Sequence, residues 1–94
     1  MIEYLYNTIR ATAGEDLAVA AIITDEEGNL LQDVCSLMLY SDTEMLFSAP
    51  GAIDGDMWVF TIPAKVTEGL NGKYWYCICC GDTKLCFKQP FYLV

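Results

Sequence analysis

The chain contains no histidine among its 94 residues. Histidine is the most frequent general base near neutral pH, a member of the common catalytic triads and the commonest metal ligand. No serine or cysteine is accompanied by another residue pattern that would supply a base. The sequence therefore predicts a protein without enzymatic activity.

Basic residues are also scarce. Lysine and arginine together number 5, against 13 aspartate and glutamate residues, which gives a net charge of −8. A nucleic-acid interface needs clustered basic side chains to neutralise phosphates. DNA and RNA are therefore not expected as partners.

Long apolar runs are absent. The longest, residues 17–23, has the length of a strand and is far too short to cross a membrane. The opening residues Met1-Ile2-Glu3-Tyr4 do not have the basic start and apolar core of a secretory signal. These observations predict that the protein does not associate with a membrane. They also predict that it is made in a reducing cytoplasm.

The cysteines fit that compartment. There are 5 of them, and an odd number without a secretory signal favours free thiols that behave as small buried apolar residues. Four thiolates could bind zinc, and the candidates are Cys77, Cys79, Cys80 and Cys86. However, an extended strand directs Cys77 and Cys79 to the face opposite Cys80, so these ligands cannot converge on one ion. No metal and no cofactor is expected. Cys80 and Cys86 flank one hairpin, and a disulfide between them on oxidation is a less favoured alternative.

Turn residues divide the chain into short apolar or alternating segments. The expected strands are residues 2–12, 17–23, 34–40, 45–48, 57–62, 74–80 and 85–94, and the one expected helical turn is 64–70. Short strands with regular turn signals and almost no helix predict an all-β fold, an immunoglobulin-like antiparallel β-sandwich of about seven strands in a single domain of residues 1–94. The predicted core comprises Leu17, Val19, Ile23, Leu37, Leu39, Trp58, Phe60, Ile62, Leu70, Tyr74, Tyr76, Ile78 and Phe91.

The segment from Tyr74 to Cys80 is the expected central strand, and it is apolar on both faces. One face carries Tyr74, Tyr76, Ile78 and Cys80, and the other carries Trp75, Cys77 and Cys79. A strand with two apolar faces is covered twice, either within the fold or by another molecule. We therefore expect a partner-binding surface, made of Trp75, Cys77, Cys79, Met38 and Tyr40.

The order Gly72-x-Tyr74-x-Tyr76 resembles the tyrosine corner of immunoglobulin-like sandwiches. In that corner, a tyrosine two residues before a core position bonds back to the preceding crossover. The resemblance implies that the Tyr74 hydroxyl bonds to the chain just before it. The usual cysteine partner on the second strand is missing, so the expected sandwich is stabilised by packing alone.

Three linked segments resemble the immunoglobulin-like domains of tailed-phage virion proteins, notably the N-terminal domain of upper baseplate proteins. They are Gly14-Glu15-Asp16-Leu17 through Thr24–Asn29, then Val59–Ala64 with Thr67 and Leu70, and then Gly72–Tyr76. They occur in the family's order over residues 14 to about 80. The resemblance implies a small structural protein of a phage or prophage particle, made in the cytoplasm of a bacterial host and then located in the virion, in the baseplate or tail or as a decoration or adaptor of the head.

The sequence thus favours a non-enzymatic virion protein that contacts other virion structural proteins, as a homo-oligomer or in many copies. Its apolar surface with an acidic rim would select a basic partner surface. Two alternatives remain open at this stage. One is a metal- or thiol-dependent regulatory domain that uses Cys77, Cys79, Cys80 and Cys86. The other is a carbohydrate- or cell-surface-binding module with Trp75 or Trp58 as the sugar platform.

Overall fold

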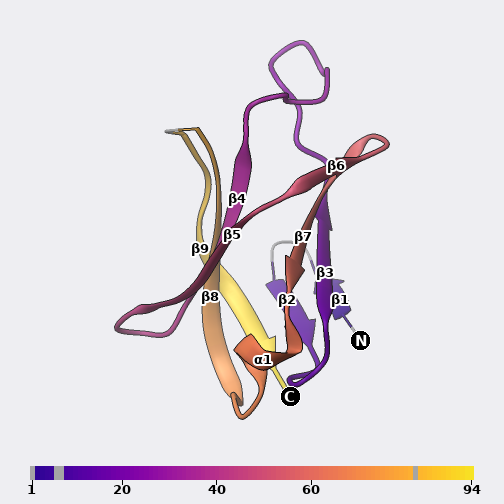
Figure 1. Cartoon of the computed structure of the whole chain (residues 1–94). Helices are drawn as coiled ribbons and strands as arrows, with labels where there is room; N and C mark the ends of the chain where they lie inside the picture. The colour runs from indigo at the N-terminus through magenta and orange to yellow at the C-terminus, as the bar shows by residue number, and fades with distance from the viewer. Residues whose placement is uncertain (1, 6–7, 82) are drawn as a thin grey trace.

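The computed structural model describes the backbone of residues 2–5, 8–81 and 83–94, and the side chains of 2–4, 8–81 and 88–94 (Figure 1). Within these ranges no helix combines the length and apolar character that a membrane crossing requires. The described elements are β1 (Ile2–Leu5), β2 (Thr8–Ala11), β3 (Leu17–Ala21), β4 (Cys35–Tyr40), β5 (Met45–Pro50), β6 (Ala52–Asp54), β7 (Met57–Ile62), α1 (Ala64–Thr67), β8 (Gly72–Cys80) and β9 (Thr83–Leu93).

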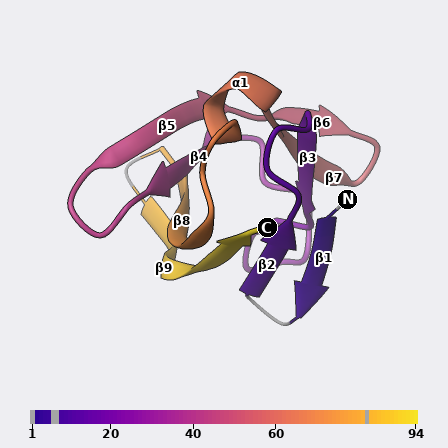
Figure 2. The ribbon, with the colours of Figure 1, turned by 90° about the horizontal axis from the view of Figure 1, so that it is seen from below.

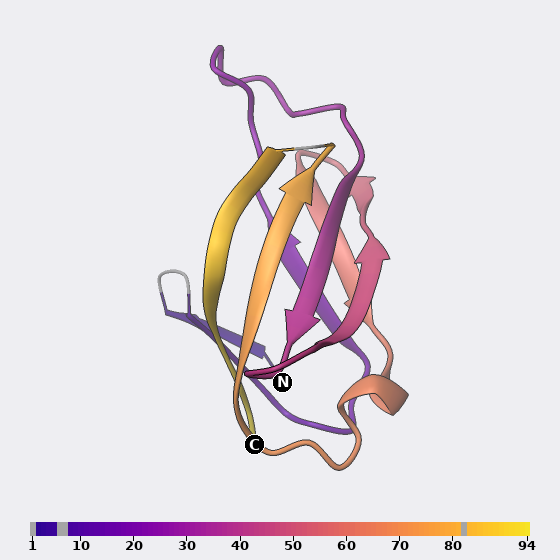
Figure 3. The ribbon, with the colours of Figure 1, turned by 90° about the vertical axis from the view of Figure 1, so that its left-hand side faces the viewer.

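The strands form two sheets that face each other. The larger sheet has the order β1-β2-β9-β8-β4-β5, and the smaller has the order β3-β7-β6. Figure 3 shows the larger sheet in front with the smaller one behind it, and Figure 2 shows the two layers from below. The prediction of an all-β protein is confirmed.

The strand count and the pairing differ from the prediction. The expected first strand, residues 2–12, is two strands, β1 and β2, which pair antiparallel. A further short strand, β6, pairs with β7. The pairing of β2 with β9 is parallel, so the sandwich is not antiparallel throughout. Parallel neighbours require a long connection, and here the two strands come from opposite ends of the chain.

Two of the three prolines lie within strands, and Pro63 directly follows β7. Pro50 is the last residue of β5, and β5 is an edge strand of the larger sheet, where a missing N–H is tolerated. The strand β9 continues through Pro90, which lies opposite Trp75 of β8.

The core lies between the two sheets. Most of the predicted core residues are buried, and the two exceptions, Leu70 and Tyr74, are half-buried and pack against the core. The prediction missed Ile9, Ala11 and Leu93, which are also buried. These residues lie on β2 and β9, and their burial follows from the parallel pairing that joins Ile9 to Phe91 and Ala11 to Leu93.

The crossover between the sheets is short and is tied to the loop before β3. The helix α1 covers only four residues, fewer than the predicted 64–70. The amide of Ala64 donates to Asp16 Oδ1 at 2.8 Å, so the loop supplies an acceptor for the first turn of the helix. The hydroxyl of Thr67, which is fully buried, accepts a bond of 3.0 Å from the amide of Gly14.

Replacing Thr67 with valine should lower the free energy of unfolding by about 0.5–1.5 kcal/mol, because it removes the part-buried hydrogen bond that the amide of Gly14 donates to the Thr67 hydroxyl. Chemical denaturation would measure the change. Thr67→Ser keeps the hydroxyl and should recover most of the loss. If Thr67→Ser and Thr67→Val lower the free energy of unfolding equally, the hydrogen bond from Gly14 to the Thr67 hydroxyl does not contribute to stability.

The cysteines are not all free thiols, and this expectation is corrected. Cys35 and Cys80 form a disulfide. The two residues lie directly opposite each other on β4 and β8, with Cα atoms 4.0 Å apart, and both are buried on the inner face. The alternative pairing of Cys80 with Cys86 does not occur, because Cys80 is bonded to Cys35. The disulfide joins neighbours within one sheet and does not link the two sheets.

Candidate functional site

The structure brings the five residues of the predicted partner-binding surface together on one face. In the β4–β8 ladder, Tyr40 lies opposite Trp75 and Met38 opposite Cys77, and Cys79 follows in the next alternate position. Their alternates on β4, Cys35, Leu37 and Leu39, are buried in the core. The five residues therefore lie on the outer face of the larger sheet, which is the face turned to the viewer in Figure 3. Their role in binding remains a prediction.

The five residues differ in how far a partner could reach them. Trp75, Cys79, Met38 and Tyr40 are half-buried. Cys77 is fully buried, yet it is not part of the core cluster between the sheets. The side chain of Lys88 also lies on this face, because the lysine starts on β9 and places its ammonium 4.8 Å from the centre of the Tyr40 ring on β4. Since β8 lies between β9 and β4, the lysine side chain crosses over β8.

Trp75 is held in one orientation by polar contacts. Its indole Nε1 donates to Asp42 Oδ1 at 3.0 Å, and the ammonium of Lys73 lies 4.4 Å from the centre of its ring. The Tyr40 hydroxyl in turn donates to Met38 Sδ at 3.4 Å. A half-buried aromatic ring that is already ordered loses little side-chain entropy when a partner covers it.

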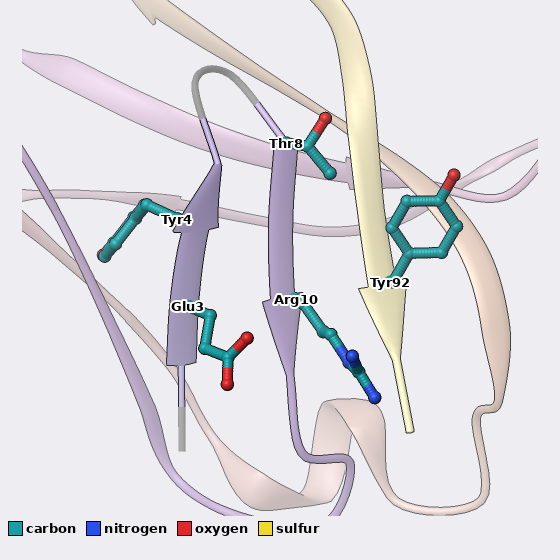
Figure 4. Close-up of a pocket in the computed structure, with 5 residues that line it drawn as sticks. All are labelled: Glu3, Tyr4, Thr8, Arg10 and Tyr92. Atoms are coloured by element: carbon teal, nitrogen blue, oxygen red, sulfur yellow. The ribbon is translucent and has the colours of Figure 1, made fainter.

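The outer face continues beyond the predicted residues. A row of direct strand neighbours runs across four strands, from Glu3 on β1 to Arg10 on β2, Tyr92 on β9 and Lys73 on β8. Part of this row borders a surface concavity of about 360 Å³ that Glu3, Tyr4, Thr8, Arg10 and Tyr92 line (Figure 4). Its volume is within the range of small-ligand sites.

Sequence reasoning did not find this concavity. Thr8 and Arg10 are two positions apart in the predicted first strand, which places them on the same face. Nothing local indicates that β2 lies beside β9, so the approach of Tyr92 to Arg10 was not visible in the sequence.

Charge is distributed unevenly over the molecule. Arg10, Lys73 and Lys88, three of the 5 basic residues in the chain, lie on this outer face. Of the described acidic residues, only Glu3 and Asp54 lie on strands, and the others lie in turns and connections. We call the three basic residues, together with the rings of Tyr40, Trp75 and Tyr92, the cationic strip.

The acidic turn after β3 has a structural role. The carboxylate Oδ1 of Asp25 accepts bonds of 2.9 Å from the amides of Glu27 and Asn29, and Gly28 adopts a φ of 86°, which favours glycine. Bonds from a side chain to the following amides are typical of an Asx turn. This carboxylate therefore organises its own loop.

Trp58, the alternative sugar platform, lies in the core. Its ring is 4% exposed and stacks on Phe60 with centroids 6.4 Å apart. Its Nε1 donates to the carbonyl oxygen of Leu31 at 3.0 Å. A ring buried in this way has no free face for a ligand, so Trp58 does not fit that role.

The cysteine set of the other alternative is divided between two environments. Cys80 is bonded to Cys35 on the inner face, whereas Cys77 and Cys79 lie on the outer face. The side chain of Cys86 lies outside the described residues. Among the side chains that the structure describes, no group of three or more potential ligands gathers in metal-binding geometry.

Comparisons of the chain with protein-family models, curated proteins and solved structures found no match.

Proposed function

We propose that this chain is a non-enzymatic structural protein of a phage or prophage particle, with an immunoglobulin-like sandwich fold. It works by contact with other virion proteins, in many copies, through the outer face of the larger sheet. This face is centred on Trp75 and includes Tyr40 and Met38.

The strand arrangement supports the immunoglobulin-like assignment. The larger sheet joins β9, β8 and β4 as neighbours, as the G, F and C strands are joined in such domains, and the smaller sheet joins β3, β7 and β6 as B, E and D are joined. The Tyr74 hydroxyl lies 3.4 Å from the carbonyl oxygen of Asn71, to which it donates. This bond to the chain just upstream has the form of a tyrosine corner.

The motifs that resemble phage virion domains meet in space, which supports the family proposal. Gly14 bonds to Thr67, and Asp16 bonds to Ala64, so residues from the first and second segments hold the crossover against the loop before β3. Motif residues that bond to one another in this way define the fold. Trp75, which falls between the two tyrosines of the third segment, takes no part in these bonds and lies on the outer face of β8.

The contact role depends mainly on one observation: β8 is apolar on both faces, and Trp75 on its outer face is still partly accessible. Its inner face is sealed by the smaller sheet, with Tyr76, Ile78 and Cys80 buried. Its outer face carries Trp75. This side chain stays partly exposed even though Asp42 and Lys73 contact it. Ordered aromatic residues with area still accessible are the usual anchors of protein interfaces.

The proposed location is compatible with the disulfide. A cytoplasm keeps thiols reduced, so a chain made there would carry Cys35 and Cys80 as thiols. The two residues already lie opposite each other in the ladder, and they would be joined when the particle leaves the cell. Thiol titration of protein taken before and after cell lysis would follow this change.

Trp75→Asp is expected to prevent incorporation of the chain into particles while leaving the fold intact, because a carboxylate would replace the central anchor of the contact. Gradient-purified particles from a producing culture would be analysed by mass spectrometry for copies of the chain per particle. Ile22→Asp is the matched control, because Ile22 is 69% exposed and lies away from this face, after β3.

The control should be incorporated normally, and circular dichroism should show that both variants are folded. If Trp75→Asp is unfolded, the Trp75 side chain is required for the fold, and its assignment as a contact residue is wrong. A folded Trp75→Asp chain at the normal copy number, or the absence of the unaltered chain from particles, would contradict the proposed function.

A further inference from the structure

The cationic strip indicates the chemistry of the partner. We propose that the concavity beside Arg10 receives a carboxylate side chain from an acidic segment of the partner protein. This inference rests on the proposed function and names the partner's contact surface. It reverses the expectation from composition alone, which was a basic partner for an acidic protein.

Arg10 is the proposed anchor of this contact. In Figure 4 its side chain runs from β2 toward the end of β9, with the guanidinium below the point where Tyr92 leaves β9, while the Tyr92 ring and Thr8 lie above it. A guanidinium can bind a carboxylate through two parallel hydrogen bonds. Tyr92 is the direct neighbour of Arg10 across the β2–β9 pairing, and its ring, 37% exposed, offers apolar area for the methylene groups of a glutamate.

Further basic residues extend the attraction along the sheet. Tyr92 has a basic neighbour on each side, Arg10 on β2 and Lys73 on β8. Lys88 follows on the same face, with its ammonium over Tyr40. An acidic segment that lies across β2, β9 and β8 would therefore meet three cations in succession.

Two carboxylates limit the attraction and provide a test of it. Asp42 is bonded to Trp75 at one side of the strip, and Glu3 lies directly opposite Arg10 at the other. If the ligand group is anionic, Glu3 repels it, and removal of the Glu3 charge must strengthen binding. If the ligand group were cationic or required an acceptor, the same change would weaken binding.

The experiment uses the full chain labelled with ¹⁵N and a hexaglutamate peptide as the probe. Amide chemical shifts would be followed by NMR during a titration at low salt. Shifts should concentrate at residues 8–10, 73 and 91–93, and they should diminish as salt is added. Hexalysine, the probe of opposite charge, should not shift these amides.

Three variants separate specific from general charge effects. Arg10→Glu should weaken hexaglutamate binding at least ~tenfold, because it removes the anchor and adds repulsion. Lys65→Glu makes the same change of charge on the exposed surface of α1 and should leave binding nearly unchanged. Glu3→Gln should tighten binding about threefold.

The proposal is wrong if hexaglutamate leaves the amides of the strip unshifted, if Lys65→Glu weakens binding as much as Arg10→Glu, or if Glu3→Gln weakens binding. These results are distinct from failure of the proposed function. If hexaglutamate does not bind but Trp75→Asp still prevents incorporation into particles, the partner's chemistry is wrong and the contact role stands.

Discussion

Removing the disulfide by the replacement Cys35→Ala is expected to lower the free energy of unfolding by about 4 kcal/mol. The bond joins residues that are 45 positions apart, and a cross-link over a loop of that length removes much of the conformational entropy of the unfolded chain. Both sulfur atoms are buried, so the loss of packing adds to the effect. Guanidinium denaturation of the oxidised protein and of the variant would measure the difference.

Two controls make this result specific. Cys79→Ala alters a half-buried thiol on β8, next to Cys80, that is not in a disulfide, and it should change stability by less than about 1 kcal/mol. Treatment of the unaltered protein with a reductant should reproduce most of the Cys35→Ala effect. If the reduced and oxidised forms unfold at the same denaturant concentration, the bridge contributes nothing to stability.

Phe91→Ala is expected to destabilise the protein by about 3–5 kcal/mol. The ring is completely buried and lies on β9 between Ile9 of β2 and Tyr74 of β8. It also packs edge-on against Tyr76, with ring centroids 6.0 Å apart. Deletion of the ring leaves a cavity at the junction of the parallel and antiparallel parts of the larger sheet, where the surrounding strands cannot easily collapse.

The neighbouring residue supplies the comparison for Phe91. Tyr92 is on the outer face and partly exposed, so Tyr92→Ala should cost less than about 1 kcal/mol. Denaturation midpoints of the two variants would be compared. Similar losses from both replacements would contradict the placement of Phe91 in the core and Tyr92 outside it.

Strand positions could be predicted because alternation is a local property. Trp58, Phe60 and Ile62 alternate with less buried residues along β7, and each side chain of a strand points opposite to the next. The same rule separated Trp75 and Cys79 from Tyr76 and Cys80 on β8, and the ladder with β4 confirms this division. No knowledge of neighbouring strands was needed for these predictions.

The cysteines show where local reasoning ended. The odd number of cysteines, a property of the chain as a whole, favoured free thiols. Whether two thiols meet depends on register, and Cys35 is opposite Cys80 only because β4 and β8 are adjacent in one sheet. The short distance between Cys80 and Cys86 in the sequence therefore does not predict which cysteine Cys80 is bonded to.

By itself, the sequence determined that the chain forms short strands, which residues share a strand face, and that β8 is apolar on both sides. The tertiary structure alone decided the parallel pairing of β2 with β9, the disulfide and the concavity beside Arg10. The physical reason is that side-chain direction within a strand follows from backbone geometry, whereas strand neighbours are selected by the packing of the whole core between the two sheets.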